Sequence, residues 1–395
     1  MRGAKALEYI DWEALCKLAT DARNVPCAIG DQYGFGGRHV VREIVFDDGK
    51  HWIARVGIPA VNFNSEENYI PTPLSCSWST TKAKMMQSEI DTMSFLGEHT
   101  DIPVPHVFAF DPTATNKVGA PYMFMECVQG TCAVDMPGSR GDIPEQYKTN
   151  FYASEASVLV RCLELNDKLT LQMRIWNVKF DKIGCIFKNP GTGHYEIGPL
   201  PNGLGGPYST ATEYYRAWAA ANMSKPGATS DFPSRIETIA SMISKNDNGP
   251  FRLIHPDFGH NNIIVDDDFN MLSVIDWEYS FVGPPELAAR FPIRLQMYPE
   301  AILPQERDAN GRIMDEDWRK MSENREHWVN QVALQESSSC DAPRLSSSMF
   351  EVQADILFMI RMWEERMPWM YTYQAGVKEG LDMIQQRLRQ TKQRT

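Results

Sequence analysis

The first third of the chain alternates short apolar runs with polar turns. Residues 40–46 (VVREIVF) and 51–56 (HWIARV) are rich in β-branched and apolar residues, and residues 47–50 between them carry an Asp-Gly pair. Two such runs joined by this kind of turn form a β-hairpin. Residues 121–128 (PYMFMECV) are typical of one further, buried strand. The pattern predicts a β-rich N-terminal region.

Residues 80–99 follow a helical period instead. Their apolar positions recur every three or four residues with charges between them, and prolines 103 and 105 follow. Four more helices are predicted, at residues 145–165, 211–222, 232–244 and 349–367. Residues 188–207 are rich in Gly and Pro and predict a loop with short strands, and residues 337–348 form a Ser-rich connector.

These elements predict an α+β, bilobal protein. A small β-rich lobe with one main helix occupies residues 1–128, and a larger, mainly helical lobe occupies residues 129–395, with the boundary near 127–132. The length of 395 residues agrees, because a typical domain has about 150 residues.

Composition narrows the classes of function. Lys and Arg number 39 against 51 Asp and Glu, a net charge of −12, which argues against a general nucleic-acid or anionic-membrane binder but allows a local phosphate pocket. The eight cysteines form no C-x-x-C pair, so free thiols are expected. With neither a secretory leader nor an apolar run of about 20 residues, we expect a cytoplasmic protein without a nucleic-acid or membrane partner.

Residues 253–283 carry the strongest chemical signal. Residues 263–265 and 272–275 are apolar strands around an acidic turn, and pairing Ile263 with Ile275 places Asn262 beside Asp276. An amide oxygen and a carboxylate are hard ligands of the kind that Mg²⁺ accepts together with substrate phosphates.

The loop before this hairpin adds a candidate base. Asp257 stands five residues before Asn262 and is expected at the same end of the hairpin, where it could accept a proton from an attacking hydroxyl. His255 is placed to orient that loop.

This order of residues resembles the active-site core of the aminoglycoside phosphotransferase and choline kinase-like family, which shares the protein-kinase fold. His-Pro-Asp-Phe at 255–258 is similar to the fungal members in particular. The resemblance implies that Asp257 is the catalytic base and that His255 is the structural histidine of the catalytic loop. It also implies that Asn262 and Asp276 are the metal ligands.

The N-terminal region matches the same family in order. Gly34, Gly36 and Gly37 precede the first hairpin strand, where such kinases place a loop over the nucleotide phosphates. Arg55 stands where a phosphate-binding lysine is usual, and Glu89 on the next helix is placed to pair with it. Since arginine has a planar fork and a different reach, the replacement of lysine is not neutral.

Residues 123–129 resemble the hinge between the lobes of these kinases, where backbone groups of Glu126 and Val128 would bind the purine. The resemblance therefore implies ATP, with GTP left open, and Mg²⁺ as cofactors. It implies transfer of the γ-phosphoryl group to a hydroxyl of a small molecule. The C-terminal hundred residues carry no motif that identifies this acceptor.

Several of these residues also have a simpler interpretation. Asn262 and Asp276 could be turn residues that cap strands, and the three acidic residues 266–268 are more typical of a solvated hairpin tip than of a metal site. His260 and His39 are expected to be exposed loop histidines without a role. Trp277 and Glu278 are expected to be structural.

Two other functions compete with small-molecule phosphorylation. Arg55 in place of lysine motivates a catalytically impaired, kinase-like nucleotide-binding or interaction protein. A protein kinase is a weaker alternative, because the helical region lacks the Ala-Pro-Glu segment and the activation-loop pattern expected there.

Overall fold

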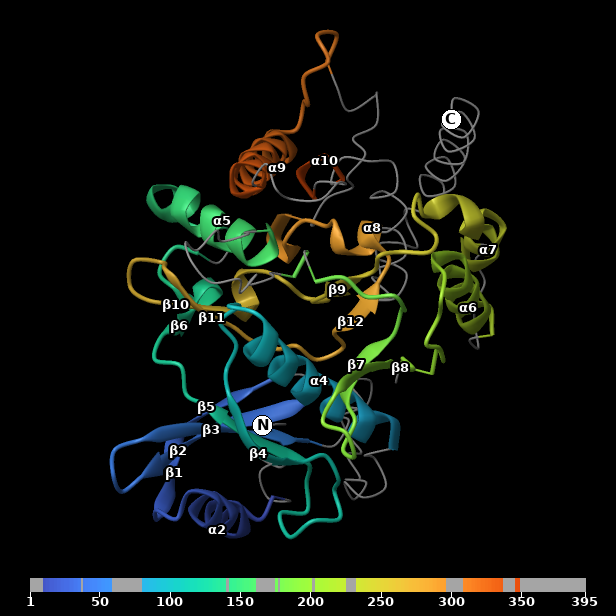
Figure 1. The fold of residues 1–395 in the computed structure, drawn as a ribbon. Coiled ribbons are helices and arrows are strands. Elements are labelled where there is room, and N and C mark those ends of the chain that lie inside the picture. The colour runs from blue at the N-terminus through green and yellow to red at the C-terminus, as the bar shows by residue number, and fades with distance from the viewer. Residues whose placement is uncertain are drawn as a thin grey trace, which may run out of the picture.

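The computed structural model describes residues 10–36, 38–58, 80–139, 142–160, 175–176, 178–200, 203–224, 232–295, 308–336 and 345–348. Figure 1 shows a sheet near the N-terminus, with most of the helices gathered beyond it. The predicted combination of a β-rich N-terminal region with a mainly helical remainder is confirmed for these residues.

The N-terminal sheet has five antiparallel strands in the order β1-β2-β3-β5-β4. The strands are β1 (Cys27–Phe35), β2 (His39–Phe46), β3 (His51–Gly57), β4 (Val107–Asp111) and β5 (Tyr122–Glu126). Val45 pairs with His51, which confirms the hairpin predicted at the Asp-Gly turn. Strand β5 confirms the predicted buried strand.

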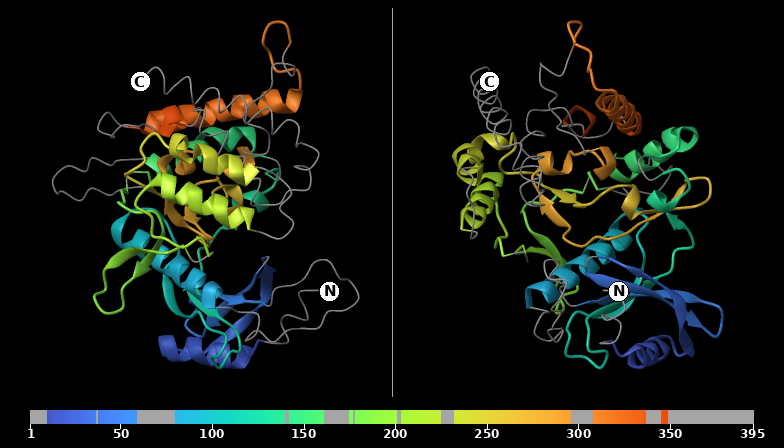
Figure 2. Two further views of the ribbon diagram at one scale, coloured as in Figure 1. Left: turned by 90° about the vertical axis from the view of Figure 1, so that its right-hand side faces the viewer. Right: turned by 180° about the vertical axis from the view of Figure 1, so that it is seen from behind.

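Strand alternation gives this sheet two different faces. Trp52, Ala54 and Val56 of β3 are buried on one face against helix α2 (Trp12–Arg23). Arg55 therefore points to the opposite face. Figure 2 shows α2 at the far end of the molecule from the helices of the C-terminal part, so the face that carries Arg55 is the one directed toward them. Asp11 is the N-cap of helix α2, and its side chain accepts a hydrogen bond from the Ala14 N–H at 2.9 Å.

Helix α4 (Thr80–His99) confirms the helix predicted at 80–99. Its buried residues Met86, Ile90, Met93 and Leu96 pack with Met123 of β5 in the large hydrophobic cluster that also fills the C-terminal part. The cluster around α2 and the outer face of the sheet is a separate one. The apolar stripe of α4 thus belongs to the larger core.

The remaining helices and strands build the C-terminal part. In chain order the structure has β6 (Thr131–Cys132), η1 (Ala133–Asp135), α5 (Glu145–Val160), β7 (Cys185–Lys188), β8 (Tyr195–Gly198), α6 (Ala211–Met223), α7 (Phe232–Ile243), β9 (Arg252–Ile254), η2 (His260–Asn262), β10 (Ile263–Val265), β11 (Met271–Val274), β12 (Phe281–Gly283), α8 (Pro285–Ala288), η3 (Ile293–Leu295), α9 (Glu316–Gln335) and α10 (Leu345–Ser348).

Three of the four later helices are confirmed as α5, α6 and α7. The helix predicted at 349–367 lies outside the described residues, as does most of the connector at 337–348, of which the last four residues form α10. Helices α5 and α9 pack against each other. Hairpin β7–β8 supplies the short strands that were predicted with the Gly- and Pro-rich loop at 188–207, although β7 begins three residues earlier.

A buried ion pair joins the helices of the C-terminal part. Arg294 donates from both terminal nitrogens to the two carboxylate oxygens of Glu155 on α5, each at 2.6 Å, and Trp328 of α9 donates to the same carboxylate at 3.1 Å. Arg294 Nε also lies 3.3 Å from Asp142. Because Arg294 and Glu155 are both buried, their charges are satisfied by each other rather than by water.

Strands β10 and β11 form the hairpin predicted around the acidic turn, but in a different register. Ile263 pairs with Val274 and not with Ile275, and a bulge lies further along the hairpin, between Ile264 and Val265. The Ile275 N–H instead donates to the Asn262 carbonyl at 2.9 Å. Ile275, and not Asp276, therefore lies opposite Asn262, and Asp276 is the next residue along the chain.

The acidic turn itself agrees with the simpler interpretation. Asp266 accepts hydrogen bonds from the N–H groups of Asp268 and Asn270 at 3.0 and 2.8 Å, so its carboxylate closes the turn. Asp267 and Asp268 are exposed. The prediction of a solvated hairpin tip is confirmed.

Two general expectations concern the chain as a whole. The five cysteines that the structure describes are free thiols, as predicted. None of the helices in the described part combines the length and the apolar character needed to span a bilayer.

Candidate active site

The loop between β9 and β10 is fixed by a buried imidazole. His255 donates from Nε2 to the Ile275 carbonyl at 2.9 Å, and its Nδ1 accepts the Asp257 N–H at 3.2 Å. The ring packs edge-on against the fully buried Trp277, with 4.7 Å between ring centroids. Burial lowers the pKa of His255, which favours the neutral ring that one donated and one accepted bond require. His255 thus ties the loop to the hairpin.

Asp257 is held by two amides. Its Oδ2 accepts from Asn261 Nδ2 at 2.8 Å and from Asn262 Nδ2 at 3.0 Å, and its carbonyl accepts from Asn262 Nδ2 at 2.9 Å. These bonds orient the half-buried carboxylate in the way that a positioned base requires. The sequence analysis missed Asn261, although it stands directly before a candidate ligand.

The two candidate metal ligands lie at the open end of the hairpin. Asn262 is buried, and its amide nitrogen is occupied by Asp257, which leaves the amide oxygen as a donor atom for a cation. Asp276 has a side chain that is 42% exposed and a backbone in the left-handed region, with φ of 60°. A non-glycine residue seldom adopts this conformation, and such strain is typical of functional turns.

This donor set fits Mg²⁺. In the ranges that the structure describes, His, Cys, Asp and Glu nowhere gather in a group of three or more that could hold a metal. One carboxylate and one amide oxygen are too few for a cage made by protein alone. They suit an ion that keeps most of its coordination for water and substrate phosphates.

Arg55 connects the sheet to this hairpin. One terminal nitrogen donates to Glu89 on α4, and the other donates to Asp276 Oδ1 at 2.9 Å and to Glu278 Oε2 at 3.2 Å. Burial opposes the charge of Arg55, but the carboxylates of Glu89, Asp276 and Glu278 outweigh it and raise the pKa of Arg55 above its usual value. The predicted pair of Arg55 with Glu89 is confirmed.

Glu278 belongs to the same charged cluster. Its Oε2 accepts from Arg55, and its Oε1 accepts from Arg38 at 3.2 Å. Glu278 was expected to be merely structural, and only its place two residues after Asp276 could have suggested more. Trp277 between them is structural as expected, since it is fully buried and donates to the Val274 carbonyl at 3.0 Å.

The glycine-rich segment forms the turn between β1 and β2. Gly34 is part of β1, and the Gly36 N–H donates to the His39 carbonyl at 2.9 Å to close the turn. A side chain added at Gly34 would meet no atom of the residues that the structure describes within 4 Å, so among these residues the space beside the strand is open. Gly37 lies outside the described residues.

The expectation of exposed histidines is wrong at both positions. His39 is 5% exposed, with Nδ1 3.8 Å from Glu278. Burial, with Arg55, Arg38 and Lys82 nearby, holds the pKa of His39 well below its usual value.

His260 is 7% exposed, because its helical turn packs into the core instead of projecting as a loop. Both of its ring nitrogens lack a hydrogen-bond partner among the described residues. Burial and the charge of Arg294 lower the pKa of His260 to about 4, against a smaller opposing effect of Asp142.

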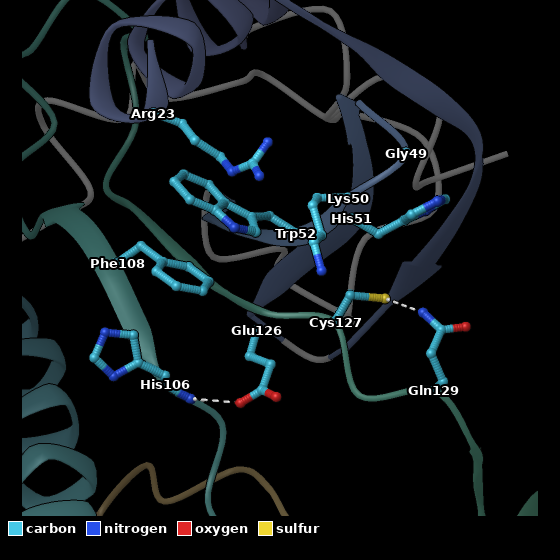
Figure 3. Close-up of a pocket in the computed structure, with 10 residues that line it drawn as sticks. All are labelled: Arg23, Gly49, Lys50, His51, Trp52, His106, Phe108, Glu126, Cys127 and Gln129. Carbon is cyan, nitrogen blue, oxygen red and sulfur yellow. Dashed lines mark hydrogen bonds between the residues drawn. The ribbon is translucent and has the colours of Figure 1, made fainter. Parts of the chain in front are cut away.

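The predicted hinge lies at the end of strand β5. Glu126 ends β5, and its N–H donates to the His106 carbonyl at 2.8 Å, while Val128 is half-buried. An open pocket of about 810 Å³ lies there, and in it Trp52 and Phe108 stack with 4.2 Å between ring centroids. Figure 3 shows Glu126 extending below these two rings. None of the residues that line this pocket belongs to the catalytic loop or to the Arg55 cluster.

The structure thus brings together two groups of predicted residues. His255, Asp257 and Asn262 are joined by hydrogen bonds, and Arg55, Glu89 and Asp276 are joined by ion pairs. The Ile275 N–H bond to Asn262 links the groups through the hairpin. Glu126 and Val128 belong to neither group and lie at the end of β5 and just after it.

Comparison with known proteins bears on this arrangement. Residues 193–322 match the sequence profile of the phosphotransferase enzyme family. The predicted family resemblance is confirmed. The part of the chain that matches this phosphotransferase family includes the loop between β9 and β10 and the hairpin that follows, with His255, Asp257, Asn262 and Asp276.

Two curated fungal proteins are similar to parts of this chain. A subtelomeric hrmA-associated cluster protein of Aspergillus fumigatus is 46% identical over 61 residues, which are 15% of this chain and 11% of that protein. The clavilactone A biosynthesis cluster protein Y of Ampulloclitocybe clavipes is 26% identical over 271 residues, which are 63% of this chain and 60% of that protein. The chain thus matches about a tenth of the first relative's length and three fifths of the second's.

A solved structure supports the phosphotransferase fold. A protein from Haemophilus somnus that is named as a fructosamine-3-kinase superposes with a TM-score of 0.50 at 12% identity, covering 96% of this chain and 99% of that one. At this identity the match concerns the fold alone. The predicted α+β, bilobal, protein-kinase-like fold class is confirmed.

Proposed function

We propose that this protein is an ATP- and Mg²⁺-dependent phosphotransferase that moves the γ-phosphoryl group to a hydroxyl of a small molecule. The observation that carries the proposal is the contact of Arg55 with Asp276, which follows the hairpin at the end where Asn262 precedes β10 and bonds to Asp257. Phosphoryl transfer requires a cation, oxygen ligands and a positioned base at one place, because its catalysis is mostly positioning and charge neutralisation.

Asp257 is the proposed general base. Its carboxylate would accept the proton of the acceptor hydroxyl, and the amides of Asn261 and Asn262 orient it for that task. His255 acts through the loop rather than on the substrate, since both of its ring nitrogens are used in hydrogen bonds to the backbone.

Asn262 and Asp276 would hold Mg²⁺ through the amide oxygen and a carboxylate oxygen. The ion, when bound there, neutralises negative charge on the nucleotide phosphates. Arg55 supplies further positive charge beside them, and its contacts with Glu89 and Glu278 keep the guanidinium in place.

We assign the nucleotide to the lobe at residues 1–128 and the acceptor to the lobe at 129–395. The loop of Gly34, Gly36 and Gly37 would cover the phosphates, and the open space beside Gly34 supports this. The Glu126 carbonyl and the Val128 N–H would bind the purine, since the Glu126 N–H is already used within the sheet. The name of the relative from Ampulloclitocybe clavipes refers to a biosynthesis cluster, which supports a small metabolite as acceptor.

A phosphate-transfer assay tests this proposal. Wild-type protein is incubated with Mg²⁺, γ-labelled ATP and a panel of choline, homoserine, sugars and aminoglycosides, with Asp257→Asn in parallel. We expect label on at least one acceptor, and a rate at least about 100-fold lower in the variant, the size typical of a lost general base. Nucleotide binding should persist in the variant. Undiminished transfer by Asp257→Asn would contradict the assigned base, whereas nucleotide binding without transfer to any acceptor or to water would favour the impaired, kinase-like protein.

A further inference from the structure

Arg38 joins the glycine loop to the segment after Asp276. It directly precedes β2, and its Nη1 lies 3.2 Å from Glu278 Oε1, across 240 residues of sequence. Its guanidinium carbon lies 4.6 Å from the centroid of the Tyr279 ring, which places the cation over an aromatic face. One arginine thus bridges the two segments that would enclose a nucleotide's phosphates.

Glu278 is shared between two arginines. Its Oε1 accepts from Arg38 and its Oε2 accepts from Arg55. Lys82 of α4 faces the same place, because a cavity of about 20 Å³ is lined by Lys82, Arg38, Glu278 and Tyr279 among others. Three cations therefore surround this carboxylate.

Metal binding by Asp276 would change the charge around Arg55. Asp276 now lies 2.9 Å from Arg55 and offsets part of its positive charge. A carboxylate that ligates a metal would offset less of that charge. The positive charge left beside Arg38 and Arg55 would then favour phosphate.

The two arginines differ in how firmly they are held. Arg55 is buried and bonded to three carboxylates. The side chain of Arg38 is 53% exposed, and with the residues that the structure describes it makes one hydrogen bond, of 3.2 Å, in place of the two-bond fork that arginine forms with carboxylates at its strongest. Arg38 is therefore the cation that can exchange partners.

Tyr279 supports the resting position of Arg38. Its φ of 64° lies in the left-handed region, where a residue with an aromatic side chain is rare. This backbone conformation leaves Tyr279 partly exposed beneath the guanidinium. The arrangement is a stacked support, of the kind that guanidinium groups adopt on aromatic faces.

We propose that Arg38 is a phosphate-binding residue of the nucleotide site and that Glu278 holds it in place until a nucleotide enters. Arg38 then moves from Glu278 to the terminal phosphates, while Glu278 keeps its contact with Arg55. This inference rests on the proposed function, since it needs a nucleotide in the cleft. It adds a second arginine beside Arg55.

Binding measurements with ATP and AMP test the assignment of Arg38. Titration calorimetry with Mg²⁺ compares the wild type with Arg38→Gln and Arg38→Lys. We expect Arg38→Gln to weaken ATP binding about tenfold, the size of one lost charged hydrogen bond, and to leave AMP binding unchanged. Arg38→Lys should recover part of the loss, because it keeps the charge without the fork. Arg312→Gln is the matched control, since Arg312 is exposed in the turn before α9.

The outcomes separate this inference from the proposed function. A wild type that binds no nucleotide overturns both. A wild type that binds ATP, with Arg38→Gln equal to it, overturns the role of Arg38 alone. Equal weakening of ATP and AMP binding by Arg38→Gln, or equal weakening of ATP binding by the Arg312 control, assigns Arg38 a structural or general charge effect and also overturns the inference.

Glu278→Gln tests the exchange of partners. The amide keeps the shape of the side chain but no longer competes with phosphate for Arg38. We therefore expect ATP to bind at least about twofold more tightly than to the wild type, with the difference abolished when Arg38→Gln is added. Weaker ATP binding by Glu278→Gln would overturn the exchange.

Discussion

Arg55 Nη2 lies 2.9 Å from Asp276 Oδ1, although 221 residues separate the two in sequence. Arg55 belongs to the sheet and Asp276 to the hairpin of the C-terminal part, so this contact links the two parts at the candidate metal ligand. The same arginine contacts Glu89 and Glu278. One guanidinium fork thus organises three carboxylates, which a lysine ammonium at the same place would arrange differently.

Arg55→Lys should lower activity rather than restore it. Lysine keeps the charge but cannot present two terminal nitrogens to Glu89 on one side and to Asp276 and Glu278 on the other. We expect a loss of about tenfold or more in kcat/KM for ATP, the size of one or two charged hydrogen bonds. Steady-state kinetics checks this, and a higher turnover in Arg55→Lys would indicate a decayed enzyme that has lost the usual lysine.

Asp276→Ala should abolish the Mg²⁺-dependent part of nucleotide binding. A ligand that binds only the folded protein raises the unfolding temperature, so ATP with Mg²⁺ should stabilise the wild type more than ATP alone. The variant should show equal shifts with and without Mg²⁺ in a thermal-unfolding titration.

Asp267→Ala is the matched control for that titration, because Asp267 is an exposed carboxylate in the turn of the same hairpin. We expect it to behave as the wild type. Loss of the Mg²⁺ effect in Asp267→Ala, with Asp276→Ala unaffected, would move the metal site to the turn.

Glu155→Gln should destabilise the protein strongly. It removes the carboxylate that accepts hydrogen bonds from both terminal nitrogens of the buried Arg294. Among the described ion pairs, the guanidinium then keeps only the one with Asp142. We expect the free energy of unfolding to fall by about 3 kcal/mol in urea titrations, as for other broken buried ion pairs. Glu98→Gln breaks an exposed pair with Lys188 and should cost less than about 1 kcal/mol. Similar losses in the two variants would show that burial does not set the strength of the Arg294 pair.

His260 should make the fold sensitive to acid. Its pKa is about 4 in the folded protein and about 6.5 when unfolded, so the unfolded state takes up the proton first as the pH falls. Stability associated with His260 is complete above pH 6.5 and is lost progressively from there toward pH 4, by about 1 kcal/mol at pH 5 after allowance for solvent screening. Unfolding temperatures measured between pH 7.5 and 5 should therefore fall less in His260→Gln than in the wild type. Parallel curves for the two proteins would contradict this role of His260.

Local signals in the sequence were sufficient for part of the fold. The Asp-Gly turn predicts the β2–β3 hairpin, and the helical period of residues 80–99 predicts α4 with its bounds. Strand β1 was not predicted, because its glycines and Asp31 interrupt the apolar pattern. The β10–β11 register was wrong by one residue, because strands of three and four apolar residues contain too few alternating positions to fix their pairing.

The candidate site was predictable where residues stand close in sequence. The motif from His255 to Asn262 forms its own hydrogen bonds, and the Arg55 pair with Glu89 followed from the family's order. The positions of Glu278 and His260 depend on packing between distant segments, which no local pattern contains. The roles of the site residues in binding and catalysis stay predictions until they are tested.

Helix α4 packs its apolar side with the larger core, whereas the outer face of the sheet has a core of its own with α2. The inner face of the sheet meets α4 through Met123 of β5 and through the pair of Arg55, which the sheet carries, with Glu89, which the helix carries. This ion pair is therefore a polar bridge across an otherwise apolar contact. A pair of spectroscopic labels on β3 and α4 would measure whether the distance across that contact changes when a nucleotide binds.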